Sequence, residues 1–104
     1  MIITTTNMIP GRNFEILGIA EGATVQTKNV GRDFMAGLKN LVGGELKGYT
    51  EMMNEARRIA RDRMIAQAQS MGADAIVGFE YMSSEVAQGA AEVVAYGTAV
   101  RFVQ

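Results

Sequence analysis

Residues 50–81 constrain the fold of this 104-residue chain more than any other stretch. The first part, EMMNEARRIARDRMIAQAQSM, places apolar and polar residues on opposite sides of a helical wheel, which is typical of an amphipathic helix. The apolar arc consists of Tyr49, Met52, Met53, Ala56, Ala60, Met64 and Met71. Gly72 is expected to end this helix, because glycine accepts the left-handed backbone that often follows a helix C-terminus. The apolar run ADAIVGFEY then predicts a strand directly after the helix.

Four stretches have the composition of strands. Residues 2–6 are β-branched and predict a short edge strand, and residues 14–27 predict a long strand. Gly18 and Gly22 indicate a bulge, a bend or a close backbone approach within the long strand. One face of that strand is expected to carry Glu15, Leu17, Ile19, Glu21, Ala23 and Val25. Residues 74–82 and 93–103 predict an antiparallel hairpin, joined by a small and polar connection over residues 83–92.

A second, shorter helix is predicted between the long strand and the long helix. Phe34, Leu38, Leu41 and Val42 follow the spacing of one buried helical stripe. The pair Gly43-Gly44 is expected to end this helix. An anion-binding loop is the alternative for these glycines, but neither of the common glycine-rich phosphate motifs is present. The whole chain, residues 1–104, therefore predicts one α+β domain of two layers, with an antiparallel sheet of three to four strands packed on one long and one short helix.

The absence of cysteine and histidine excludes several classes of chemistry. A disulfide, a zinc site of the usual ligands, a Cys–His or Ser–His catalytic pair and the common haem and iron–sulfur ligations all need one of these residues. The net charge of −1 gives no overall attraction to nucleic acid or to an anionic membrane. The N-terminus has no signal-peptide pattern and no stretch is long and apolar enough to span a bilayer, so we expect a cytoplasmic protein without a membrane partner.

The last two predicted strands carry large apolar side chains on both faces. Two helices can cover only one face of a small sheet, so a lone subunit would expose a large apolar patch. Self-association is the simplest way to cover it. Arg63 lies within the apolar arc of the long helix. Its stem could pack while its head reaches water, or it could form an ion pair with Glu15, Glu21 or Glu80, within the chain or from another subunit.

Several residues in a fixed order resemble a known family. They are Gly31-Arg32-Asp33, Gly43-Gly44, Tyr49, Glu55-Ala56-Arg57 with Ala60, the run from Gly72 to Gly78, and Tyr96-Gly97-Thr98-Ala99-Val100. Their order and spacing over nearly the whole chain resemble the YbjQ-like family of uncharacterised bacterial and archaeal proteins. The resemblance implies a dodecin-subunit-like α+β fold and a ring-shaped homopentamer. It also implies heavy-metal binding. Soft metals, however, favour thiolate and imidazole ligands, which this chain lacks.

The sequence leaves three classes of function open. We expect a non-enzymatic, oligomeric protein that binds a ligand or metal ion or serves as a scaffold, with its cofactor unknown. The candidate ligand or interface residues on the less covered sheet face are Glu15, Glu21, Glu80 and Arg101, to which Arg63 is added. The alternative is a small enzyme that uses carboxylate, arginine and tyrosine chemistry at a subunit interface, with Glu51 and Glu55 as a possible acid–base pair.

Nucleic-acid binding is the weakest of the three hypotheses. Arg57, Arg58 and Arg61 form a local basic patch, but acidic residues lie beside them. Arg58 and Asp62 have the spacing of an ordinary helical ion pair. Methionines of the apolar arc could offer thioether ligands to a soft metal, but at these positions they are typical of a hydrophobic core.

Overall fold

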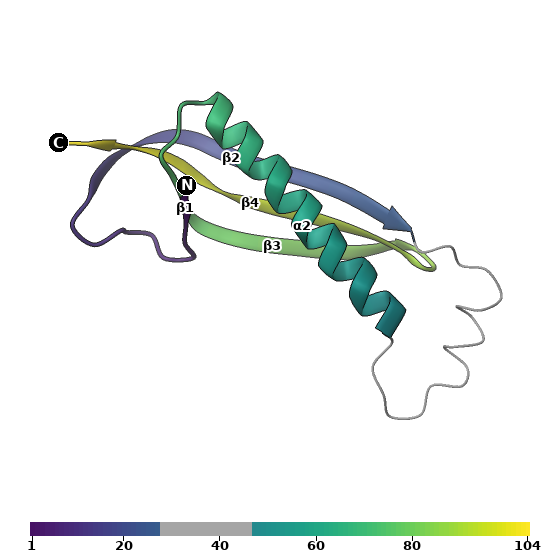
Figure 1. Cartoon of the computed structure of the whole chain (residues 1–104). Helices are drawn as coiled ribbons and strands as arrows, with labels where there is room; N and C mark the ends of the chain where they lie inside the picture. Colours follow the sequence, from purple (N-terminus) through teal and green to yellow (C-terminus); the bar gives the residue numbers. More distant parts are fainter. Residues whose placement is uncertain (28–46) are drawn as a thin grey trace.

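The computed structural model describes residues 1–27 and 47–104, which form one helix packed on one side of a four-stranded sheet (Figure 1). The elements are β1 (Ile2–Ile3), β2 (Asn13–Thr27), α2 (Lys47–Ser70), β3 (Ala75–Ala87) and β4 (Ala90–Val103). The strand order in the sheet is β1-β3-β4-β2. This arrangement confirms the predicted α+β fold. The predicted shorter helix and the Gly43-Gly44 pair lie outside the described residues.

Helix α2 buries the side that its sequence pattern predicts. Ala56, Ala60 and Met64 have no exposed surface, and Met52 is 8% exposed. Gly72 has a φ of 80° and lies just after the helix. Beyond it, the Ala73 amide donates to the Ala68 carbonyl at 3.1 Å, which satisfies a carbonyl of the last turn. The predicted end of the helix is therefore confirmed.

The sheet is mixed rather than wholly antiparallel. Strands β2, β4 and β3 pair in antiparallel fashion, but β1 pairs in parallel with β3, with Ile2 opposite Ala75. The segment after β1 extends this contact, since the Gly78 amide donates to the Thr6 carbonyl at 2.9 Å. The antiparallel prediction holds for β2, β3 and β4 and fails for β1, because the direction in which strands distant in sequence pair leaves no local signal.

The hairpin of β3 and β4 is longer than the sequence predicts. Both strands continue through the small and polar residues 83–92, leaving a tight turn at Gln88-Gly89, where Gly89 has a φ of 72°. Weak strand formers such as Ser83 and Ser84 are held in place by continuous pairing with β4. Tertiary pairing thus overrides local propensity in this part of the chain.

Glycines in β2 account for how closely the helix approaches the sheet. A Cβ atom at Gly22 would lie 2.3 Å from the Met64 amide nitrogen and 2.4 Å from the Ala60 carbonyl oxygen. Only a residue without a side chain allows this backbone contact. The register of β2 against β4 shifts between Ile16 and Gly18, which confirms a bulge at the first glycine.

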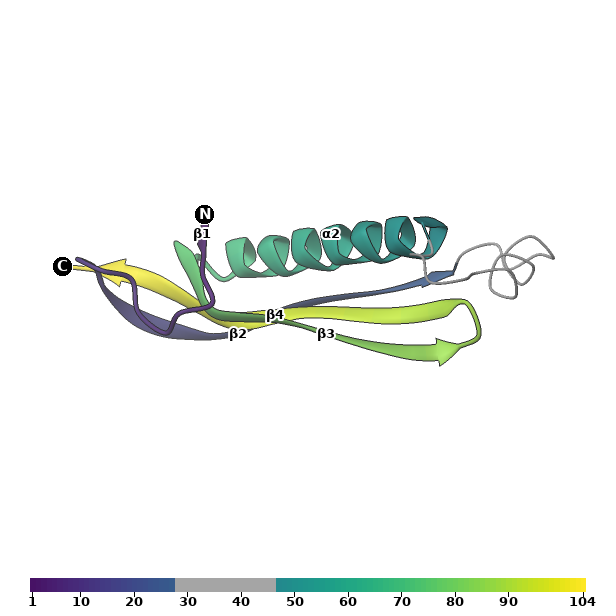
Figure 2. The ribbon, with the colours of Figure 1, turned by 90° about the horizontal axis from the view of Figure 1, so that it is seen from below.

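The two faces of the sheet have different cover (Figure 2). Helix α2 lies over one face, mainly on β2 and β4, and its core includes Ala20, Val93 and Ala99. The N-terminal segment crosses to the opposite face and covers one end of it, where Ile9 packs with Ala75, Val77, Val100, Phe14 and Phe102. The rest of that opposite face has no cover from the described residues.

Candidate functional site on the open face of the sheet

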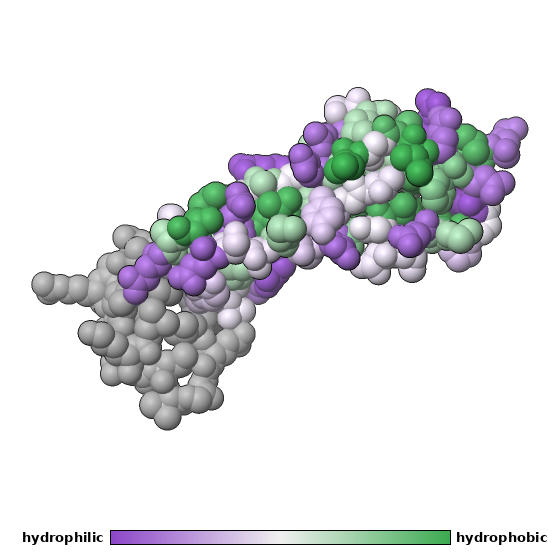
Figure 3. Space-filling view, turned by 180° about the vertical axis from the view of Figure 1, so that it is seen from behind, coloured by the Kyte–Doolittle hydropathy of each residue, from purple (hydrophilic) through white to green (hydrophobic). Residues whose placement is uncertain are grey.

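The sheet face turned away from α2, which we call the open face, carries exposed apolar side chains. Ile16 and Ile19 on β2 are 71% and 70% exposed, Val25 is 54% exposed, and Met82 on β3 is 59% exposed. Seen from behind the helix, apolar side chains follow this side of the molecule and are interrupted by polar ones (Figure 3). Isolated exposed apolar residues are ordinary, but several on one sheet face make that face the candidate site.

A row of polar residues crosses the middle of the open face. Tyr96 of β4 is opposite Glu21 of β2 on one side and Glu80 of β3 on the other. The Tyr96 hydroxyl donates to Glu80 Oε2 at 2.7 Å. This hydrogen bond to a carboxylate raises the pKa of Tyr96, because loss of the proton would remove the donor and leave two negative charges side by side. The row therefore presents two carboxylates and a phenol held by neighbouring strands.

Two predicted site residues lie on the other face of the sheet. Glu15 and Arg101 are opposite each other on β2 and β4 and form an ion pair. Regular alternation along the strand predicts Glu15 and Glu21 on one face. The bulge at Leu17 inserts an extra residue and reverses the alternation, so that Glu15 shares the face of α2 and Glu21 shares the open face. Glu15 and Arg101 satisfy each other's charge and are not part of the open-face row.

Arg63 binds a backbone carbonyl instead of a carboxylate. Its Nη1 donates to the Ala23 carbonyl oxygen at 2.7 Å. Among the described residues, Arg63 forms no ion pair with Glu15, Glu21 or Glu80. The head group is at the surface, where it bonds the backbone of β2. Gln67, one helical turn later, accepts from the Glu21 amide at 2.6 Å. Gln67 is not among the residues predicted from the sequence, and its i, i+4 spacing from Arg63 is the signal that could have identified it.

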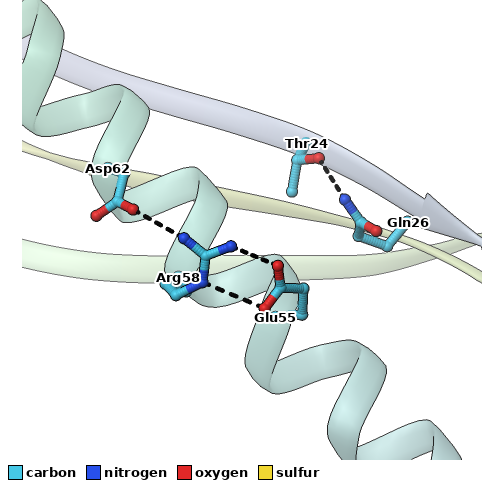
Figure 4. Close-up of polar contacts among 5 residues, drawn as sticks. All are labelled: Thr24, Gln26, Glu55, Arg58 and Asp62. Carbon is cyan, nitrogen blue, oxygen red and sulfur yellow. Dashed lines mark hydrogen bonds and ion pairs between the residues drawn. The ribbon is translucent and has the colours of Figure 1, made fainter.

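The exposed side of α2 is a network of ordinary ion pairs (Figure 4). Arg58 bonds Asp62 at 3.1 Å, as its spacing predicts, and also bonds Glu55 one turn earlier. The hydrogen bond from Arg58 lowers the pKa of Glu55. A general acid needs the opposite shift, so the geometry gives no support to Glu51 and Glu55 as an acid–base pair. The acidic partners of Arg58 also reduce the basic patch that could bind nucleic acid.

Tyr81 and Tyr96 do not share a pocket, because they lie on opposite faces of the sheet. Tyr96 lies on the open face, whereas Tyr81 is opposite Ala95 on the face of α2 and packs edge-on against Phe79, with ring centroids 4.7 Å apart. On β2, the Gln26 side chain donates to the hydroxyl of buried Thr24 at 3.0 Å (Figure 4). This contact satisfies a buried polar group and offers no reactive atom to a ligand.

The described residues offer no ready metal centre within one chain. Over residues 1–27 and 47–104, no three His, Cys, Asp or Glu side chains gather in a way that could hold a metal ion. Met52 and Met64 are buried in the core beneath α2, and Met53 and Met71 pack against it. Their thioethers fill space between helix and sheet. A metal held by carboxylates would need residues from more than one copy of the chain.

The helix that the structure describes is too polar to cross a bilayer, and no other described segment is a helix. The cytoplasmic location stays a prediction.

Comparison with known proteins decides the family. A family model described as "Putative heavy-metal-binding" matches residues 1–103. The chain belongs to the YbjQ-like family. Its relatives include a UPF0145 protein of Clostridium novyi, which is 54% identical over 99% of this chain and 100% of its own length. A UPF0145 protein of Thermotoga maritima is 57% identical over 97% of this chain and 96% of its own length.

A solved structure supports the fold of this YbjQ-like chain. A protein of unknown function of the DUF74 family from Pediococcus pentosaceus aligns with a TM-score of 0.66, covering 99% of this chain and 98% of that one. At 18% identity, this structural similarity supports the fold alone. The names of these relatives give no reaction and no ligand.

Proposed function

We propose that this member of the YbjQ-like family is a self-assembling, non-enzymatic protein whose copies pack through the open face. The exposure of Ile16, Ile19, Val25 and Met82 on one sheet face carries the proposal. A second copy is the occupant that the chain itself supplies, and most soluble oligomers are symmetric assemblies of identical chains. The family resemblance favours a ring of five copies.

The polar row offers the assembled protein a site for a ligand. Each copy contributes Glu21 and Glu80, and Glu92 lies further along the same face. Symmetry would bring several such carboxylates together, which suits a hard cation bound by oxygen ligands. Arg12 lies at the far end of the face, over the ring of Phe102 at 4.3 Å, and does not neutralise the row. A cation bound between copies is therefore the ligand class that we propose.

Native mass spectrometry of the purified protein tests the assembly. We expect a mass near five times the 11.2 kDa of one chain. The variant Ile19→Glu places a charge on the open face and should yield single chains, whereas Ala66→Glu on the exposed side of α2 should leave the mass unchanged. A wild-type mass of one chain at micromolar concentration would refute the proposal.

Calorimetric titration with divalent cations tests the ligand separately. Binding by the wild-type assembly and its loss in Glu21→Gln/Glu80→Gln, with the oligomer mass unchanged, is the expected result. Equal binding by both proteins would refute the cation site and leave the assembly untouched.

A further inference from the structure

The two outer edges of the sheet differ in how their backbone groups are bonded. Strand β2 forms one edge along its whole length, because only β4 pairs with it among the described residues. On the other side, β1 and the segment after it bond β3 as far as Phe79. From Glu80 onward, the outer side of β3 has no strand beside it in the described part of the chain. An open strand edge invites pairing with another chain.

Side chains of α2 occupy the middle of the β2 edge. The Glu21 amide and the Ala23 carbonyl point outward from β4, where Gln67 accepts from the first and Arg63 donates to the second, at 2.6 and 2.7 Å. Within a strand, the N–H and C=O of one residue point to the same side. The Glu21 carbonyl and the Ala23 amide therefore lie between two groups that are already bonded.

Gly22 is the reason that these side chains reach the edge. Its missing side chain lets the backbone of α2 contact β2 at Met64 and Ala60. Arg63 lies immediately before Met64 and Gln67 follows one turn later, so both can extend past the strand. The close approach of the helix and the closure of the edge are thus one structural feature.

What remains of the β2 edge is divided into short runs. The bulge at Leu17 interrupts the strand on one side of the bonded stretch, and the strand ends at Thr27 on the other. A strand that added here would find only a few consecutive backbone partners. On β3, residues 80–85 pair with β4 in unbroken register, so their outer side is a longer uninterrupted edge.

We infer that Arg63 and Gln67 close the β2 edge against pairing with a strand from a second copy, and that they thereby restrict edge-to-edge contact to the outer stretch of β3. The inference concerns how growth of the sheet is limited and does not depend on packing through the open face. An unguarded edge on both sides of one sheet would allow open-ended polymerisation. With one edge closed, association stops at a finite size.

The test compares the wild-type protein with Arg63→Ala/Gln67→Ala. The matched control is Arg61→Ala/Gln69→Ala, which removes the same side-chain types from exposed positions of the same helix that have no bond to β2 in the described part of the chain. The rescue variant, Arg63→Lys/Gln67→Glu, keeps a donor and an acceptor of similar reach. Light scattering reports the size distribution, and amide hydrogen exchange reports the bonding of Glu21.

For Arg63→Ala/Gln67→Ala we expect species heavier than those of the wild-type protein, increasing with protein concentration. At the lowest concentration, the Glu21 amide should exchange about tenfold faster once its side-chain acceptor is removed. The control and rescue variants should resemble the wild-type protein in size. If the alanine variant keeps the wild-type size distribution, or if the control grows equally, the inference is overturned.

Should the double variant fail to fold by circular dichroism, Gln67→Ala alone decides the question. It removes one small polar contact and should still produce heavier species and faster exchange at Glu21. Unchanged exchange at Glu21 would show that the guarding bond does not form in solution, and would equally overturn the inference.

Discussion

The two faces of the sheet differ in the size of their apolar side chains and in whether a helix covers them. Under α2 the buried strand residues are mostly small, such as Ala20, Gly22, Ala95 and Ala99. On the open face the exposed residues are large, such as Ile19, Val25 and Met82. Side-chain size follows the distance to the covering layer: the helix approaches to backbone contact, so only small residues fit beneath it.

This contrast indicates what the open face is suited to. Large branched side chains on a face exposed to water gain nothing in a lone chain, whereas they contribute most when another surface packs on them. The polar row of Glu21, Tyr96 and Glu80 would then give direction to the packing, because buried polar groups must meet partners. The helix-covered face serves the fold, and under the proposed function the open face serves association.

The largest expected effect is that of Gly22→Ala on the helix-covered face. The new Cβ would lie 2.3 Å from the Met64 amide nitrogen, so helix and strand must separate along their length. We expect the free energy of unfolding to fall by about 3 kcal/mol or more, measured by urea denaturation. The control Gly11→Ala has open space for its side chain and a φ of 74°, and should cost only about 1 kcal/mol. Equal effects of the two changes would contradict the close approach of α2.

A pair of methionine substitutions compares the two faces directly. Met64→Ala empties a fully buried position and should lower the free energy of unfolding by about 3 kcal/mol. Met82→Ala should change the unfolding of the separated chain by less than about 0.5 kcal/mol, because Met82 is 59% exposed there. It should instead raise the protein concentration at which copies dissociate. An equal loss of stability from both substitutions in separated chains would remove the distinction between the faces.

The hydrogen bond between Tyr96 and Glu80 predicts a pH dependence on the open face. The pKa of Tyr96 is raised in the folded chain, so its contribution to stability is present below the pKa of an unfolded tyrosine. It is lost as the pH rises through the raised pKa of the folded chain. The absorbance titration of the wild-type protein minus that of Tyr96→Phe should show this shift, and Glu80→Ala should abolish it. A titration unaffected by Glu80→Ala would contradict the polar row.

The smallest effect on stability is expected from Glu55→Gln on the exposed side of α2. This effect serves as the reference for substitutions on the two sheet faces. Arg58 lowers the pKa of Glu55, so this contribution is present above the pKa of an unfolded glutamate and is lost as the pH falls through the lowered one. Both side chains are about half exposed, and salt should screen the pair. Thermal unfolding of Glu55→Gln in low and high salt measures it. A larger effect than that of Met64→Ala would reverse the proposed ranking.

The sequence predicts most of the fold because its signals are local. The apolar arc that contains Met64 identifies α2, and Gly72 identifies its end. The parallel pairing of Ile2 with Ala75 is not predictable in this way, because it joins residues from opposite parts of the chain. The residues of the resemblance identify the family, whereas its predicted pentamer stays a prediction.

The candidate site was predicted only in part. The extra residue Leu17 in the bulge reverses the faces of the β2 residues before it, which removes Glu15 from the open face. Arg101 lies on the face of α2 by the regular alternation of β4, in which Tyr96 points to the open face. Glu21 and Glu80 lie on the expected face. Arg63 was identified as unusual from its place in the apolar arc, but its bond to a strand edge depends on the exact approach of α2.

Reactivity of a single thiol would test the account most directly. The chain has no cysteine, so Ala23→Cys on the open face and Ala66→Cys on the exposed side of α2 each introduce one unique thiol at an exposed position of the single chain. If copies pack through the open face, a thiol reagent will modify Ala23→Cys much more slowly than Ala66→Cys in the native protein, and dilution to separated chains will remove the difference. Equal rates of modification at high protein concentration would contradict the account.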